Sequence, residues 1–188
     1  NFRCPFCHNA SLVLGGAEEH YSKEDILSFL EKRRGILDGV AITGGEPLIQ
    51  NDIIDFIKQV RDMGFSVKLD TNGSFPETLF KIIDSGLCDY YAMDIKNSKQ
   101  KYAQTVGRLG YEVDRVAESV EILKNSGVDY EFRTTVCKEF HTQRDIEEMG
   151  EWLSGAKRWF LQNFVDSGDL INPEISGLDR ETMNQYLE

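Results

Sequence analysis

The sequence lacks both a long apolar run and an excess of basic residues. No stretch of its 188 residues is apolar over the length that spans a bilayer, and no secretory or transit-peptide pattern is visible. We therefore expect a cytoplasmic protein without a membrane partner; a segment before Asn1 lies outside this test.

Acidic residues outnumber basic ones by 32 to 21, which gives a formal net charge of -11. Proteins that bind nucleic acids usually carry a basic face that neutralises phosphates. The charge therefore argues against a nucleic-acid partner, and it also fits an acidic surface that serves only solubility.

Cysteine is scarce, with four in the chain. Cys88 and Cys137 lie inside apolar, strand-like runs, where a buried unpaired thiol is the commoner outcome. A chain of this length buries a sufficient core without disulfides. We expect free thiols in a reducing environment.

Beyond a connector at residues 10–16, short apolar strands alternate with helices that end at glycine. One helix is expected to begin at Ser22, with Asp25 completing a capping box, and another at Thr142 with Asp145. A third has a helical apolar period formed by Ile49, Ile53, Phe56, Ile57 and Val60. The expected strands are 38–43, 66–71, 89–96, 129–136 and 157–164. This alternation predicts an α/β fold with a parallel sheet and right-handed crossovers.

Charged residues occupy one face of three expected strands. Successive strand residues face opposite sides, and the apolar side must meet the helices. The opposite, inward side carries Lys68, Asp70, Asn72, Asp94, Lys96, Glu131 and Arg133. Buried charges need partners, so the interior is expected to hold either a polar ligand with water or a closed ion-pair network.

Two cysteines, Cys4 and Cys7, are three positions apart near the start of the chain. Thiolates at this spacing can bind one iron–sulfur cluster. The spacing alone also fits a redox dithiol, half of a zinc site or chance.

The first nine residues, Asn1-Phe2-Arg3-Cys4-Pro5-Phe6-Cys7-His8-Asn9, resemble the cluster loop of the radical S-adenosylmethionine (SAM) enzymes, C-x-x-x-C-x-aromatic-C. Cys4 and Cys7 match its second and third cysteines and Phe6 its aromatic residue. The first cysteine is then expected one position before Asn1. The following His8-Asn9 is similar to the C-H-N of glycyl-radical activating enzymes.

Further motifs carry the same resemblance. Thr43-Gly44-Gly45-Glu46-Pro47 resembles the element that holds the methionyl amino group of SAM; alone, such a turn is a weak signal. Asp70-Thr71-Asn72-Gly73 and Asp94-Ile95-Lys96 resemble elements around the SAM carboxylate and ribose. The resemblance also implies cofactor contacts for Arg133 and, near the adenine, Gln162, and a possible monovalent cation at Asp70, Thr71 and Asp94. It gives no ligand role to His8, His20 or His141.

The resemblance implies a partial (β/α)6 TIM-like barrel over residues 1–165, whose first strand precedes Asn1, and a C-terminal extension over residues 166–188 with a small helix from Asp179. It implies a [4Fe-4S] cluster that leaves one iron open for SAM, and reductive cleavage of SAM to methionine and a 5′-deoxyadenosyl radical. A flavodoxin or ferredoxin-type protein would supply the electron.

In an activating enzyme the radical removes a hydrogen from a glycine of a partner enzyme. The cysteine-rich insert of several activating enzymes is absent here, and the compact loop is most similar to the activating proteins of anaerobic ribonucleoside-triphosphate reductases. Three alternatives remain: a pyruvate formate-lyase activase, a radical SAM enzyme that modifies a small molecule such as a purine precursor, and a non-catalytic zinc-binding module.

Overall fold

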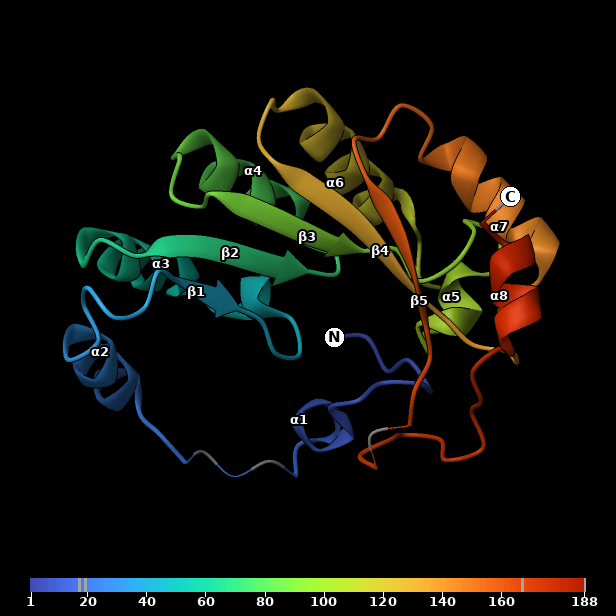
Figure 1. Ribbon diagram of the computed structural model, residues 1–188, viewed down its shortest axis with the longest axis horizontal. Coiled ribbons are helices and arrows are strands. Elements are labelled where there is room, and N and C mark those ends of the chain that lie inside the picture. Colours follow the sequence, from blue (N-terminus) through green and yellow to red (C-terminus); the bar gives the residue numbers. More distant parts are fainter. Residues whose placement is uncertain (17, 19, 167, 188) are drawn as a thin grey trace.

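The computed structural model covers residues 1–188 and describes all of them except residues 17, 19, 167 and 188. Its centre is a five-stranded parallel sheet in sequential order, as Figure 1 shows. The strands are β1 (Gly39–Ile42), β2 (Ser66–Thr71), β3 (Tyr90–Asp94), β4 (Tyr130–Val136) and β5 (Trp159–Asn163). The sheet confirms the α/β fold and the parallel pairing predicted from the alternation.

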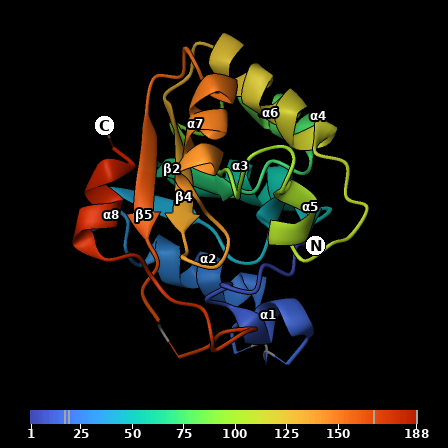
Figure 2. The same cartoon turned by 90° about the vertical axis from the view of Figure 1, so that its right-hand side faces the viewer.

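One of the five longer helices precedes β1, and the other four lie in the connections between strands. They are α2 (Lys23–Glu31), α3 (Ile53–Asp62), α4 (Pro76–Asp84), α6 (Asp114–Asn125) and α7 (Gln143–Trp152). Both expected capping boxes are present, at Ser22 with Asp25 and at Thr142 with Asp145. The sheet curves, with α4, α6 and α7 on its outer side and the N-terminal segment and α1 on its inner side (Figures 1 and 2).

Four local features differ from the expectation. Residues expected to form a connector contain the short helix α1 (Ala10–Leu14), which ends at Gly15 in the left-handed region. Ile49 ends a 3-10 turn, η1 (Pro47–Ile49), and is exposed, because the α3 helix begins only at Ile53. A further short helix, α5 (Tyr102–Thr105), was not expected. The β3 strand ends at Asp94, so Lys96 lies in the following loop.

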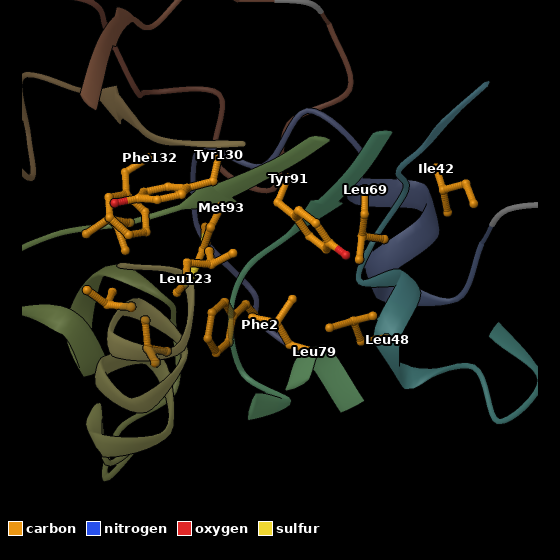
Figure 3. Close-up of a cluster of buried hydrophobic side chains, with 14 of the residues drawn as sticks. Phe2, Ile42, Leu48, Leu69, Leu79, Tyr91, Met93, Leu123, Tyr130 and Phe132 are labelled. Atoms are coloured by element: carbon orange, nitrogen blue, oxygen red, sulfur yellow. The ribbon is translucent and has the colours of Figure 1, made fainter. Parts of the chain in front are cut away.

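The core lies between the sheet and the outer helices. Figure 3 shows Leu69, Tyr91, Met93 and Phe132 from the strands packed against helix residues such as Leu79. Phe2 belongs to the same cluster, which attaches the cysteine loop to the core. Cys88 and Cys137 are buried free thiols, as predicted, and Met63, Trp152 and Trp159 pack against the core.

The segment after β5 returns to the inner side and contacts the cysteine loop. Asn172 donates its backbone N–H to the Pro5 carbonyl over 2.9 Å. Asp169 accepts a 2.9 Å bond from the Ser11 hydroxyl at the start of α1. The chain ends after α8 (Arg180–Gln185), the small helix expected from Asp179. No helix among the described residues combines the length and apolarity needed to cross a membrane.

Candidate active site

A cavity of about 210 Å³ lies at the carboxyl ends of the strands, inside the curve of the sheet. Ligands of parallel α/β proteins bind at this end. The cysteine loop forms one wall and the Gly44-Gly45 turn after β1 another, while the ends of β2, β3 and β4 form the floor. Segments that are distant in the sequence therefore share one polar space.

Four charged side chains of the cavity form a closed network. Arg133 contacts Asp94 Oδ1 at 3.0 Å and Asp70 Oδ2 at 3.4 Å, and Lys96 Nζ lies 3.0 Å from Asp94 Oδ2. Outside the cavity lining, Lys68 Nζ lies 3.0 Å from Asp70 Oδ1 without the geometry of a hydrogen bond. The two alternatives predicted for the inward charges, an ion-pair network and a polar cavity, therefore occur together. These side chains pair with one another, and four of them also line the cavity.

Burial and pairing act in opposite directions on these groups. Burial raises the pKa of Asp94, but Lys96 and Arg133 outweigh it and leave the pKa below its ordinary value. Burial lowers the pKa of Lys96, but Asp94 outweighs it and raises the pKa to about 12. Asp94 and Lys96 are therefore both charged near neutral pH.

Cys4 and Cys7 line the same cavity as this network. The backbone turns tightly between them, because Cys7 N–H donates to the Cys4 carbonyl over 2.9 Å. Burial raises the pKa of the Cys4 thiol to about 11, against the opposing charge of Lys96. A metal ion would replace the thiol proton, so both sulfurs can serve as ligands on this wall.

The Gly44-Gly45 turn opens directly into the cavity. Gly44 has φ +138°, which side-chain-bearing residues rarely adopt, and no atom lies within 4 Å of a Cβ built at either position. The glycines therefore leave the backbone of the turn open to a ligand.

The neighbouring Glu46 is buried and turns away from the cavity. Its carboxylate accepts bonds from the Thr71 hydroxyl at 2.8 Å, the Asn72 N–H at 2.7 Å and the Leu48 N–H at 3.1 Å. Burial raises the pKa of Glu46 despite these bonds. In this structure Glu46 joins the turn after β1 to the end of β2.

The structure does not bring every expected site residue into the cavity. Phe6, Asp70, Thr71, Asn72 and the other residues expected to bind the cluster, SAM or a cation line it, except Glu46 and Gln162. Gln162 is exposed on β5, the strand at the outer edge of the sheet. Glu131 accepts a 2.7 Å bond from the Tyr90 hydroxyl, towards the amino ends of the strands.

Sequence reasoning assigned no role to several lining residues. Thr135 follows Arg133 by two positions, so the strand period was a signal for it. Asn1 bonds Asn72 over 2.9 Å through its side-chain oxygen. Val13 lines the cavity from α1, and no sequence signal marked it because that helix was not expected.

The sequence model described as the Radical SAM superfamily matches residues 1–153 of this chain. The chain belongs to the radical SAM superfamily. Membership implies a [4Fe-4S] cluster and SAM as cofactors. The described residues contain no group of three or more His, Cys, Asp or Glu that could hold a metal ion. Cys4 and Cys7 can supply two thiolate ligands of such a cluster, and the third cysteine, expected before Asn1, stays a prediction.

Two curated proteins are similar to this chain in sequence. The chain is 29% identical over 197 residues to "Putative glycyl-radical enzyme activating enzyme MJ1227" of Methanocaldococcus jannaschii, an alignment that covers 100% of this chain and 78% of that protein. It is 35% identical over 102 residues to a 7-carboxy-7-deazaguanine synthase of Thermoplasma acidophilum, covering 54% of this chain and 45% of the synthase. The chain thus spans less than half the length of the second relative.

A solved structure supports the radical SAM fold. A domain of a pyruvate-formate lyase-activating enzyme from Bacteroides vulgatus superposes with a TM-score of 0.63 at 19% identity, over 79% of this chain and 90% of that domain. At this identity the likeness concerns the fold alone. It agrees with a partial TIM-like barrel, and the additional first strand stays a prediction.

Proposed function

We propose that this radical SAM protein activates a glycyl-radical enzyme, with anaerobic ribonucleoside-triphosphate reductase as the first candidate. The observation that carries the proposal is the shared cavity, in which Cys4 and Cys7 face the network of Asp70, Asp94 and Arg133. Similarity over 100% of this chain and 78% of the protein named "Putative glycyl-radical enzyme activating enzyme MJ1227" supports the choice of reaction class.

The chain's own residues bind and orient SAM in this proposal. Cys4 and Cys7 hold the cluster, which when bound supplies one electron for the reductive cleavage of SAM, drawn from a flavodoxin or ferredoxin-type donor. The open carbonyls of Gly44 and Gly45 accept hydrogen bonds from the ammonium group of SAM. Lys96 and Arg133 supply positive charge for its carboxylate, and Asp70, Asn72 and Asp94 supply acceptors for its hydroxyls.

Two further assignments have less support from the geometry. A monovalent cation at Asp70, Thr71 and Asp94 stays a prediction, since the carboxylates already pair with Lys68, Lys96 and Arg133. Gln162 lies outside the cavity lining, so we assign it no contact with the adenine.

The experiment is to reconstitute the protein anaerobically with iron and sulfide, add SAM and a strong reductant, and mix it with each candidate partner. Electron paramagnetic resonance is expected to show a glycyl radical on the reductase. Pyruvate formate-lyase serves as the competing partner. A protein that never cleaves SAM would overturn the assignment of the site, and SAM cleavage without a radical on either partner would overturn the activase.

Lys96→Ala tests the ionic network, and Lys68→Ala is the matched control. Both lysines pair with an acidic network member, but only Lys96 lines the cavity. Loss of a charge-assisted bond is expected to weaken SAM binding about tenfold or more in Lys96→Ala. Lys68→Ala should bind SAM as the wild type does.

A second candidate is a radical SAM enzyme that modifies a small molecule. The local similarity to a deazaguanine synthase, at 35% identity over 102 residues, favours it. It predicts SAM consumption that depends on a purine-like substrate and leaves no glycyl radical on a protein.

A further inference from the structure

His141, in the turn after β4, is a buried histidine without a role in the proposed chemistry. Only 2% of its surface is exposed. Its Nε2 lies 2.8 Å from the carbonyl oxygen of Lys96, and its Nδ1 lies 3.1 Å from the backbone nitrogen of Cys137. One imidazole therefore joins the loop after β3 to the turn after β4.

The partners define the tautomer. The Lys96 carbonyl can only accept, so Nε2 carries a proton and donates it to Lys96; in the neutral imidazole Nδ1 then accepts from the Cys137 N–H, and the Cys137 carbonyl also lies 3.3 Å from Nδ1. Burial lowers the pKa of His141, which favours this neutral form. The side chain thus works as a bridge with one donor and one acceptor.

Lys96 depends on this bridge because the β3 ladder ends before it. The last close backbone bond there runs from Ile95 N–H to Arg133 O, at 2.8 Å. The Lys96 N–H has only a long 3.5 Å contact with the Tyr102 hydroxyl. Among the described residues, the hydrogen bond from His141 is therefore the only short one that the Lys96 backbone makes.

The same turn also supports the cysteine loop. The Phe6 ring, which lies between the two cysteines in the sequence, packs edge-on against Phe140 at 5.8 Å between centroids and lies 6.3 Å from the ring of His141. The Asn97 side chain holds the Phe140 carbonyl at 2.9 Å. The turn therefore contacts the floor of the cavity at Lys96 and the wall formed by the cysteine loop at Phe6.

We propose that His141 is a positioning residue of the SAM site, which holds the Lys96 backbone so that its ammonium group stays on Asp94 inside the cavity. The inference rests on the proposed function only where it predicts an effect of His141 on the affinity for SAM. The positioning of Lys96 can be measured in the protein without any cofactor.

The test compares two substitutions that each keep one half of the bridge. In His141→Gln the amide nitrogen can replace Nε2 and donate to Lys96. In His141→Asn the shorter amide can replace Nδ1 but cannot reach Lys96. Tyr186→Phe is the matched control, because it removes a 3.1 Å bond from the Tyr186 hydroxyl to the carbonyl of His141 and leaves the imidazole intact.

The first readout is acylation of lysines in the cofactor-free protein, followed by mass spectrometry. In His141→Asn the labelling rate of Lys96 is expected to rise about fivefold, the change that loss of one hydrogen bond produces. His141→Gln and Tyr186→Phe should label like the wild type, and Lys68 should not change in any variant. Equal labelling of Lys96 in His141→Asn and wild type, or raised labelling in His141→Gln, would overturn the proposal.

The second readout is the affinity of the reconstituted protein for SAM. His141→Asn should weaken it by a similar factor, and His141→Gln should restore it. Raised Lys96 labelling with unchanged SAM affinity would overturn the role in the site. A wild type that fails to bind SAM would instead refute the proposed function, while the labelling still decides the positioning of Lys96. Should His141→Asn not fold, raised Lys96 labelling in His141→Gln relative to Tyr186→Phe would still overturn the proposal.

Discussion

At the residue scale, Gly107 shows how closely the cysteine loop is held. Gly107 has φ +64°, and a Cβ there would overlap the carbonyl oxygen of Arg3. Next to it, the Arg3 N–H donates to the Val106 carbonyl over 2.8 Å, and Arg108 Nε donates to the Asn1 carbonyl over 2.6 Å. The segment after α5 therefore holds residues 1–3 in place through two hydrogen bonds and a close backbone contact.

Gly107→Ala is expected to lower the free energy of unfolding by about 2–4 kcal/mol, since it adds a steric overlap to the cost of a left-handed alanine. Gly110→Ala is the control, because Gly110 has φ +79° but open space around a Cβ. It should cost only about 1–2 kcal/mol. Chemical denaturation measures both variants, and equal losses would show that the contact with Arg3 contributes nothing.

His141 also predicts a pH dependence of stability. Burial lowers its pKa in the folded protein, so the unfolded chain binds a proton more readily than the folded chain. The free energy of unfolding should therefore fall as the pH drops from about 6.5, the ordinary histidine value, towards the lowered folded pKa. Nearby, Asp145 raises the pKa and Lys101 lowers it, and neither reverses the direction.

Denaturation of wild type and His141→Gln between pH 7.5 and pH 5 measures this contribution. The variant should lose less stability than the wild type over this interval, because it has no imidazole to protonate. Parallel curves for the two proteins would contradict the prediction.

At the element scale, the α1 helix depends on a segment far away in the sequence. Its own N-cap residue makes no side-chain bond to the helix. Asp169 replaces that cap. The Asp169 carboxylate accepts hydrogen bonds from the Ser11 N–H at 3.3 Å and from the Ser11 hydroxyl at 2.9 Å. The Asp169 carbonyl accepts a hydrogen bond from the Ala10 N–H at 3.4 Å. The wall of the cavity that carries Val13 is thus held from the C-terminal side.

Asp169→Ala is expected to increase hydrogen exchange in α1 about fivefold, which corresponds to a lost cap of about 1 kcal/mol. The amides of β2 and β3 should exchange as before. Asp166→Ala is the control, because among the described residues Asp166 bonds only the nearby Gly168 N–H, at 2.7 Å. Unchanged exchange in α1 would mean that the helix holds its shape without Asp169.

At the scale of the whole molecule, the net charge of -11 predicts weak binding of nucleic acids. We expect no saturable binding of single-stranded RNA or duplex DNA below about 100 μM at physiological salt, the weak end of nonspecific binding. Fluorescence anisotropy with labelled oligonucleotides measures this. Micromolar binding that weakens steeply with salt would point to a hidden basic face.

The whole molecule also places the segment after β5 against the cysteine loop, outside the cavity lining. The cysteine loop forms a wall, and Asn172 holds the Pro5 carbonyl from behind. The C-terminal segment is therefore part of the support of the site, although its sequence carries none of the motifs.

Features that depend on local capping chemistry and on the alternation of apolar and polar residues could be predicted from the sequence. Strand–helix alternation predicted the parallel sheet, the Ser22 and Thr142 boxes predicted two helix starts, and alternating residues placed Asp70 and Arg133 on the inner face. These signals are local because a cap needs only its own turn and a strand face needs only every second residue.

Tertiary structure alone decided the rest. It separated Asp70, which reaches the cavity, from Lys68 on the same face, and it turned Glu46 towards β2. It also capped α1 with Asp169 and gave His141 its partners. Each of these outcomes depends on contacts between residues far apart in the chain, and such contacts leave no periodic or neighbouring signal in the sequence.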